Sequence, residues 1–152
     1  MTIIYRLLSA IINAVALLLS ISMLFSIPML LSSAQTMLPA FMMLAVILYS
    51  WFSFKFRREV LQQQKIVNHS LRDWVRVNGI VTLIFSIMTI LGLLPLLKNP
   101  QPFLDAVKNF GVDMPLKTAT TFFFTMLTYA TILLIHIVWT FALMKKYKEF
   151  FQ

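Results

Sequence analysis

The sequence predicts an all-α protein, an integral membrane four-helix bundle that forms a single domain over residues 1–152. The first observation is composition: 60% of the residues are hydrophobic, 12% are charged, and the mean hydropathy is +0.86. Soluble proteins carry about 25% charged residues. The second observation is that uncharged runs long enough for four helical crossings separate the charged residues. Lipid is therefore the expected solvent for most of the chain.

The first uncharged segment is long enough to hold two crossings. No Asp, Glu, Lys or Arg occurs between Arg6 and Lys55, and one crossing needs only about 20 residues. Polarity rises at 32–36, between Pro28 and Pro39, which favours a turn. The first run exceeds the about 7–15 residues of a signal-peptide core, so we interpret it as a retained helix. The predicted spans are 7–31 and 37–54.

The second half of the chain repeats this pattern. The third predicted span covers 77–97 and the fourth covers 118–144, and lysine follows each of them. Ser70 and Asp73 have the spacing of a capping box, so we expect the third helix to begin near Leu71.

The distribution of basic residues predicts the orientation. Four crossings place both termini and the loop 55–76 on one side, and the loop 98–117 on the other. The first side carries ten of the 13 basic residues, which by the positive-inside rule makes it cytoplasmic. The compact loops favour a bacterial inner (plasma) membrane. The ten are Arg6, Lys55, Arg57, Arg58, Lys65, Arg72, Arg76, Lys145, Lys146 and Lys148, and Trp51, Trp74 and Trp139 lie near the same side.

Both long loops have helical patterns. Segment 59–74 has an apolar stripe and predicts an amphipathic helix, which lies on the inner leaflet, prolongs the second and third helices, or serves as a docking surface. Segment 102–111 begins with Pro and ends with Gly, which predicts a short helix on the membrane or over the mouth of the bundle. The stripes are Val60, Val67, Leu71 and Trp74 in the first, and Phe103, Leu104, Val107 and Phe110 in the second.

The two predicted hairpins resemble each other. Trp51 and Trp139 are each followed, after five residues, by two basic residues. One interpretation is a parallel repeat of two helical hairpins about an axis along the membrane normal. The other is that any cytoplasmic helix end acquires an interfacial Trp and terminal bases.

The spans contain no acidic or basic side chain, which argues against ion- and proton-coupled transport. Uncharged polar residues instead form stripes at helical spacing. Such stripes either make interhelical hydrogen bonds or line a water-filled path. The candidate intramembrane polar site consists of His136, Thr125, Tyr129, Thr140, Asn78, Thr82 and Asn13.

His136 is the default functional candidate, because histidine is the side chain whose ordinary pKa is nearest to physiological pH and this one lies within a predicted span. If its face packs against Asn78, Thr82 and Ser86, it makes interhelical hydrogen bonds. If the face points at lipid, the imidazole is dispensable. One histidine does not supply paired haem ligands, so we expect no cofactor.

The expected function is that of an accessory or oligomeric subunit of a membrane complex, since no catalytic, cofactor or metal motif occurs. The alternative is a channel or uncoupled carrier lined by the Thr and His stripe of the fourth span. An enzyme acting on lipid, with His136 as base, is the third hypothesis. Expected partners are the lipid bilayer and other membrane subunits or a second copy. Nucleic acid is not expected, because the basic residues lie beside apolar runs.

Overall fold

The computed structural model describes residues 3–30, 34–109 and 111–152, and the side chains of residues 3–25, 37–109 and 111–152. This part of the chain is helical throughout, apart from short connections. Four of its helices are long and apolar enough to cross a membrane. The α-helices are α1 (Ile3–Leu30), α2 (Ala34–Phe56), α3 (His69–Lys98), α4 (Gln101–Asn109) and α5 (Leu116–Lys146).

The long helices cover the predicted spans within the described residues, and residue 31, the last of the first predicted span, lies outside them. Helix α2 already begins at Ala34, inside the predicted turn 32–36. Helix α3 begins two residues before Leu71, and its cap is Asn68 rather than Ser70. The Oδ1 atom of Asn68 accepts a hydrogen bond of 2.9 Å from the Ser70 backbone N–H, which satisfies a donor that the first turn leaves free.

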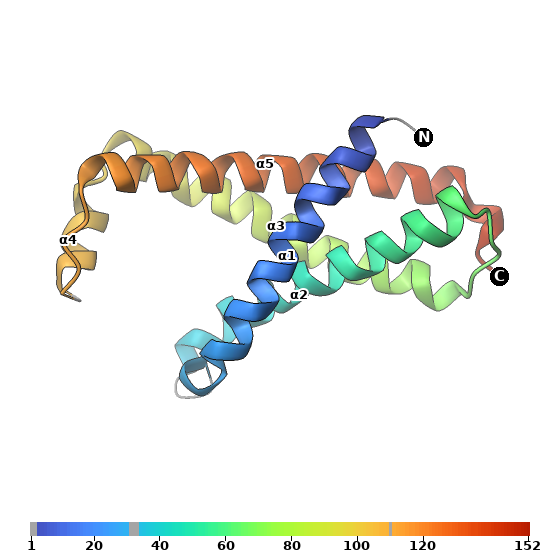
Figure 1. Cartoon of the computed structure of the whole chain (residues 1–152), viewed down its shortest axis with the longest axis horizontal. Coiled ribbons are helices and arrows are strands. Elements are labelled where there is room, and N and C mark those ends of the chain that lie inside the picture. Colours follow the sequence, from blue (N-terminus) through green and yellow to red (C-terminus); the bar gives the residue numbers. More distant parts are fainter. Residues whose placement is uncertain (1–2, 31–33, 110) are drawn as a thin grey trace.

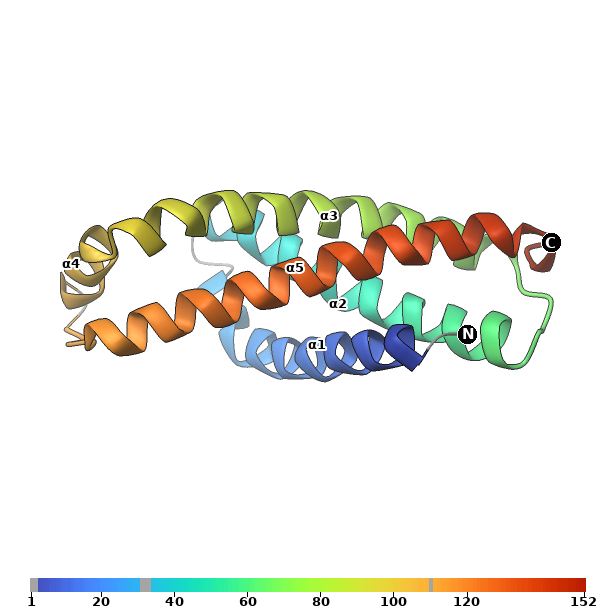
Figure 2. The same cartoon turned by 90° about the horizontal axis from the view of Figure 1, so that it is seen from above.

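The four long helices form two hairpins, α1–α2 and α3–α5. Helix α2 packs against α1 and α3, and α3 packs against α5, whereas α1 meets α5 along a shorter stretch. Figure 1 shows the start of α1, the α2–α3 connection and the C-terminus toward one end of the molecule, which we call the closed end. At the other end the second hairpin continues past the first and carries α4 (Figure 2).

The apolar core is divided in the same way. The larger cluster joins all four long helices and includes Ile12, Tyr49, Val75 and Ile137. The smaller cluster is built on Leu93, Ala119 and Phe123, and its described members all belong to 93–127. In the half of the α3–α5 hairpin that is far from the closed end, α3 and α5 therefore pack against each other and against α4. The α1–α2 hairpin lies apart from this half (Figure 1).

The prediction of one continuous amphipathic helix over 59–74 is wrong, whereas the alternative that this segment prolongs the second and third helices is confirmed for 59–62 and 69–74. The helix that continues α2 changes to a π-helical turn at Arg57–Gln62 and stops there. Gln64 has a φ of 51°, in the left-handed region that ends helices. The next residues are extended, and Val67 pairs with Phe151 near the C-terminus.

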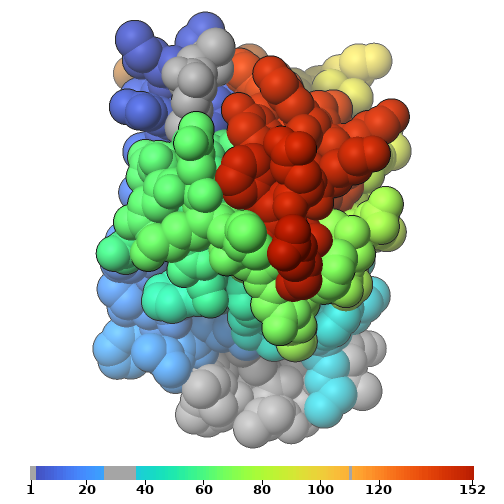
Figure 3. Space-filling view, turned by 90° about the vertical axis from the view of Figure 1, so that its right-hand side faces the viewer, coloured from blue at the N-terminus to red at the C-terminus, as the bar shows by residue number. Residues whose placement is uncertain are grey.

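The C-terminal residues fasten this connection. The Val67 N–H donates to the Phe150 carbonyl at 2.8 Å, and the Gln152 N–H donates to the Val67 carbonyl at 3.0 Å. Phe151 is buried and its ring stacks on Phe56, with 5.9 Å between the centroids. Figure 3, which faces the closed end, shows the red C-terminal residues lying against the green α2–α3 connection. Extended backbone at 64–68 thus interrupts the predicted helix, and residues 69–74 belong to α3.

The predicted short helix in the second long loop is confirmed as α4. Pro102 is its second residue, and Gly111, just after its end, has a φ of +79°, which glycine adopts without strain. Phe103 packs edge to face on Phe123, with 4.9 Å between the ring centroids. The apolar face of α4 therefore covers the ends of α3 and α5; Phe110 lies outside the described residues. The internal repeat stays a prediction.

Candidate functional site

Four polar side chains from three helices meet near the closed end. Tyr5 comes from α1, Tyr49 from α2, and His136 and Thr140 from α5. Their exposed fractions are 0%, 0%, 1% and 0%, so they are enclosed by protein. We call these four residues the polar cluster.

Thr140 lies at the centre of the hydrogen bonds in this cluster. Its hydroxyl donates to the His136 backbone carbonyl at 2.8 Å. The Tyr5 hydroxyl lies 3.0 Å from Thr140 Oγ1, and the Tyr49 hydroxyl lies 3.1 Å from the same atom. Tyr49 also lies 2.8 Å from His136 Nδ1. Both tyrosines are thereby tied to one turn of α5.

A count of protons assigns the direction of these bonds. The Thr140 proton points at the His136 carbonyl, so Oγ1 accepts from the two tyrosines. Tyr49 has then used its single proton, and its oxygen accepts from the N–H at His136 Nδ1. This arrangement uses a neutral imidazole with its proton on Nδ1. His136 Nε2 is left as a buried acceptor with no donor among the residues that the structure describes.

Ring packing adds to the hydrogen bonds. The Tyr5 ring stacks on the His136 imidazole, with 4.8 Å between the centroids and 10° between the planes. Tyr49 meets the same imidazole edge to face at 5.9 Å. The Tyr5 ring, the Tyr49 ring and the hydrogen bond at Nδ1 therefore together fix the orientation of the imidazole.

Of the predicted polar site, the structure brings only His136 and Thr140 together in this cluster. Asn13 instead makes its own contact, because its Oδ1 accepts from the Ser50 hydroxyl at 2.6 Å. That bond also joins α1 to α2. His136 makes its side-chain hydrogen bonds neither to lipid nor to the polar residues of α3, the two possibilities considered above: its partners are Tyr49 of α2 and Thr140 of α5.

The other predicted residues have separate environments. Asn78 donates to the carbonyl of Trp74 in its own helix at 2.9 Å. Thr82 Oγ1 and the Tyr129 hydroxyl are buried without a hydrogen-bond partner in the described part of the chain. Thr125 is exposed, and its hydroxyl donates to the Thr121 carbonyl one turn earlier. The sequence stripe is therefore not one continuous polar surface.

Sequence reasoning missed Tyr5 and Tyr49. Tyr5 precedes Arg6 and resembles an ordinary interfacial tyrosine, whose hydroxyl faces the headgroups. Tyr49 lies near Ser50 and Ser53 of α2, both of which are buried. That group of three hydroxyls was the available signal, and its spacing places Tyr49 and Ser53 on one face of the helix.

The cluster is suited to joining helices rather than to chemistry. For catalysis by the imidazole, a substrate would have to reach it within hydrogen-bond distance. All four side chains of the cluster are instead enclosed by protein. Among the described residues no group of three or more His, Asp or Glu side chains is placed to hold a metal ion. Hydrogen bonds between helices instead fix which faces meet inside a membrane bundle.

A groove opens between α1 and α5 where the two hairpins separate. It has a volume of about 520 Å³. Thr121, Thr125 and Thr128 contribute their side chains to its α5 wall, and each hydroxyl is bonded to its own helix backbone. These three threonines therefore give the α5 wall small side chains whose hydroxyls require no further hydrogen-bond partner. Ile11 and Val15 of α1 and Phe124, Tyr129 and Ile132 of α5 complete the lining.

Comparison of the chain with protein-family models, with curated proteins and with solved structures found no significant match.

Proposed function

We propose that this protein is a non-enzymatic subunit of a membrane complex, and that the groove between α1 and α5 receives a transmembrane helix of another subunit or of a second copy. The observation that carries the proposal is the groove itself, whose apolar lining includes three threonines with hydroxyls already bonded to their own helix. Small side chains of this kind let helix backbones approach closely in lipid, where van der Waals packing drives association.

The proposal includes insertion with four crossings and with both termini in the cytoplasm. The charge asymmetry supports this orientation, because the closed end carries most of the basic residues. The exposed surfaces of the long helices are apolar, including Leu17, Phe25, Val77 and Leu91. Burying such surfaces in lipid is favourable by about 25 cal/mol for each Å² of apolar area removed from water. The compact connections favour a bacterial inner membrane.

A second candidate function is a channel or uncoupled carrier. Two of the buried polar atoms that lack a partner among the described residues, His136 Nε2 and Thr82 Oγ1, favour it, since such atoms often mark positions that bind water. The threonines of α5 weaken it, because their hydroxyls donate to their own helix rather than toward a path. A lipid-modifying enzyme is the weakest of the three, given the enclosure of His136.

Site-specific photo-crosslinking in native membranes tests the subunit role. A photoreactive residue in place of Thr125 should form a covalent product with another protein chain, which mass measurement would identify as a second copy or a different membrane protein. Thr131 is the matched control position: it is also an exposed threonine of α5 bonded to its own backbone, and it does not line the groove. At Thr131 we expect lipid adducts.

Filling the groove gives the complementary test. Thr125→Phe should abolish the protein crosslink from a reporter at Thr128 and release the partner during purification in mild detergent. Thr131→Phe should leave both unchanged. Lipid adducts alone at Thr125 and Thr131 would contradict the subunit role, and conductance of reconstituted vesicles that depends on Thr82 would support the channel instead.

A further inference from the structure

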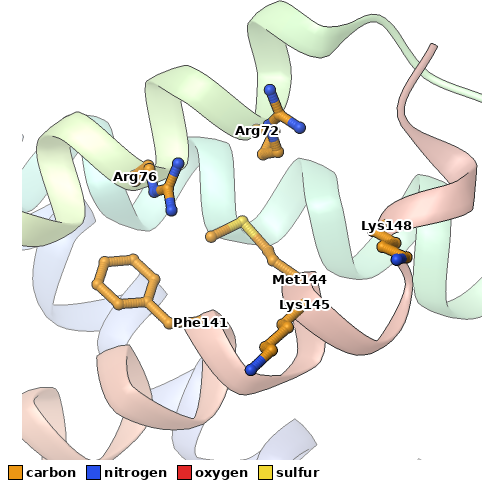
Figure 4. A pocket seen from close by; sticks show the side chains of 6 residues that line it. All are labelled: Arg72, Arg76, Phe141, Met144, Lys145 and Lys148. Atoms are coloured by element: carbon orange, nitrogen blue, oxygen red, sulfur yellow. The ribbon is translucent and has the colours of Figure 1, made fainter.

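A basic cavity lies at the closed end, between the beginning of α3 and the end of α5, with a volume of about 300 Å³. Figure 4 shows two arginines on the α3 wall and two lysines on the wall formed by α5 and the residues after it, with two apolar side chains between them. The lining residues are Arg72, Arg76, Lys145, Lys148, Phe141 and Met144.

The positive charge around this cavity is largely uncompensated. Arg72 Nε lies 3.3 Å from Asp73 Oδ1, and this is the one ion pair found in the described part of the chain. Arg76, Lys145 and Lys148 therefore have no carboxylate within ion-pair distance there. Several like charges held around one space attract an anion that enters it.

The apolar floor distinguishes this cavity from a simple basic patch. Met144 is buried and Phe141 is half-buried, and both lie between the charged walls (Figure 4). An occupant with a charged part and an adjoining hydrocarbon part would satisfy both surfaces. The volume is at the lower end of the range of small-ligand sites, about 300–1,000 Å³, which fits a headgroup rather than a whole lipid.

We propose that this cavity binds the phosphate-bearing headgroup of an anionic phospholipid, with Arg76 and Lys145 as its main cationic contacts. The inference rests on the membrane placement in the proposed function, which puts the closed end in the cytoplasmic leaflet. Arg72 and Arg76 are one helical turn apart, and guanidinium groups match phosphate oxygens in a bidentate manner. Trp74, between them in sequence, is 51% exposed and suits the headgroup level.

Lipid binding to the purified full-length chain in detergent tests the proposal. Native mass spectrometry would measure binding of phosphatidylglycerol, with phosphatidylcholine for comparison. The variant Arg76→Gln/Lys145→Gln should lose about twentyfold to thirtyfold in phosphatidylglycerol affinity, from about 1 kcal/mol for each cation near an anionic surface and about 1.4 kcal/mol for each tenfold. Arg58→Gln/Lys65→Gln removes the same charge from exposed positions outside the cavity and should retain the parent affinity.

A milder variant protects the test against misfolding. Lys148 is exposed and follows α5, so Lys148→Gln leaves the long helices intact and should weaken phosphatidylglycerol binding about fivefold. Thermal melting should be the same for all these variants.

Four results would overturn the proposal. These are equal losses in the two double variants, equal binding of phosphatidylcholine, displacement of the lipid by inorganic phosphate at comparable concentration, and tighter binding of a soluble glutamate-rich peptide. The first two indicate nonspecific binding, the third a free-anion site and the fourth a protein ligand. Persistent crosslinks at Thr125 alongside any of them would show that the subunit role stands without the lipid site.

Discussion

Tyr49 is the residue on which the polar cluster depends most, because its hydroxyl contacts both His136 Nδ1 and Thr140 Oγ1. Tyr5 reaches only Thr140 by hydrogen bond and contacts the imidazole through its ring. Loss of Tyr49 therefore leaves two buried partners to rearrange. Loss of Tyr5 leaves the bond between α2 and α5 in place.

Replacement of the imidazole tests this cluster at the scale of a single residue. His136→Leu removes the Nδ1 contact and the stacked ring, and we expect a loss of about 1–3 kcal/mol in bundle stability. The measurement is thermal unfolding in mild detergent. His69→Leu is the matched control, because His69 is the other histidine of the chain and is exposed.

A double-mutant cycle with Tyr49→Phe separates the hydrogen bond from general packing. The two substitutions should be less than additive, with a coupling energy of about 0.6 kcal/mol and at most about 1.7 kcal/mol, the average and the maximum for interhelical bonds in membranes. Full additivity, or a His136→Leu variant as stable as the parent, would mean that the bond between α2 and α5 contributes nothing. A pH-dependent conductance that disappears in His136→Leu without loss of stability would instead favour the channel.

At the scale of elements, the contact between α3 and α5 depends on Gly79. A Cβ atom at this position would lie 2.8 Å from Phe141 Cε1 and Cζ, and 3.4 Å from Tyr49 Cδ2. The missing side chain therefore lets the Phe141 ring lie directly on α3. Gly92, in the same helix, has no atom within 4 Å of such a Cβ.

The two glycines make a matched pair of predictions. Gly79→Ala should destabilise the bundle by about 1–3 kcal/mol through overpacking, reduced by up to about 1 kcal/mol from better helix propensity. Gly92→Ala should be neutral or stabilising by up to about 1 kcal/mol, since only the propensity changes. Thermal unfolding of both variants in the same detergent compares them, and Phe141→Leu should partly restore the Gly79→Ala variant. Equal behaviour of the two glycines would exclude a tight contact at Gly79.

At the scale of the whole molecule, the orientation is the feature that reporters can test directly. A reporter fused after Gln152, or inserted near Gln63, should read as cytoplasmic, and one near Asn109 should read as external. The expectation follows from the excess of basic residues at the closed end. An external reading at Gln63 would defeat the arrangement of four crossings, and would also remove the basis for a lipid site at that end.

The arrangement of the two hairpins also belongs to this scale. The closed end is held by the polar cluster, the larger apolar cluster and the C-terminal residues. Toward the other end the hairpins separate, which exposes the threonine wall of α5 and opens the groove. Because the two hairpins separate toward this end, α4 packs on α3 and α5 and not on the α1–α2 hairpin.

The sequence by itself determined the number and approximate extent of the long helices and the presence of α4. Runs free of charge, prolines and Gly111 are local properties, and each acts within a turn or two of its own position. Hydrophobic periodicity also placed His136 and Thr140 on one face of α5. Periodicity does not predict their partners, because the polar stripe of one helix does not specify how that helix is rotated or at what angle it crosses its neighbours.

Only the tertiary structure decided that α5 would bond to Tyr5 and Tyr49 rather than to the polar residues of α3. It also decided that the predicted helix over 59–74 would break, since Val67 pairs with a segment at the far end of the chain. The groove and the basic cavity arise in the same way, from side chains of separate helices that packing brings together. The physical reason is that helix formation follows from local composition, whereas these contacts follow from the mutual burial of surfaces distant in sequence.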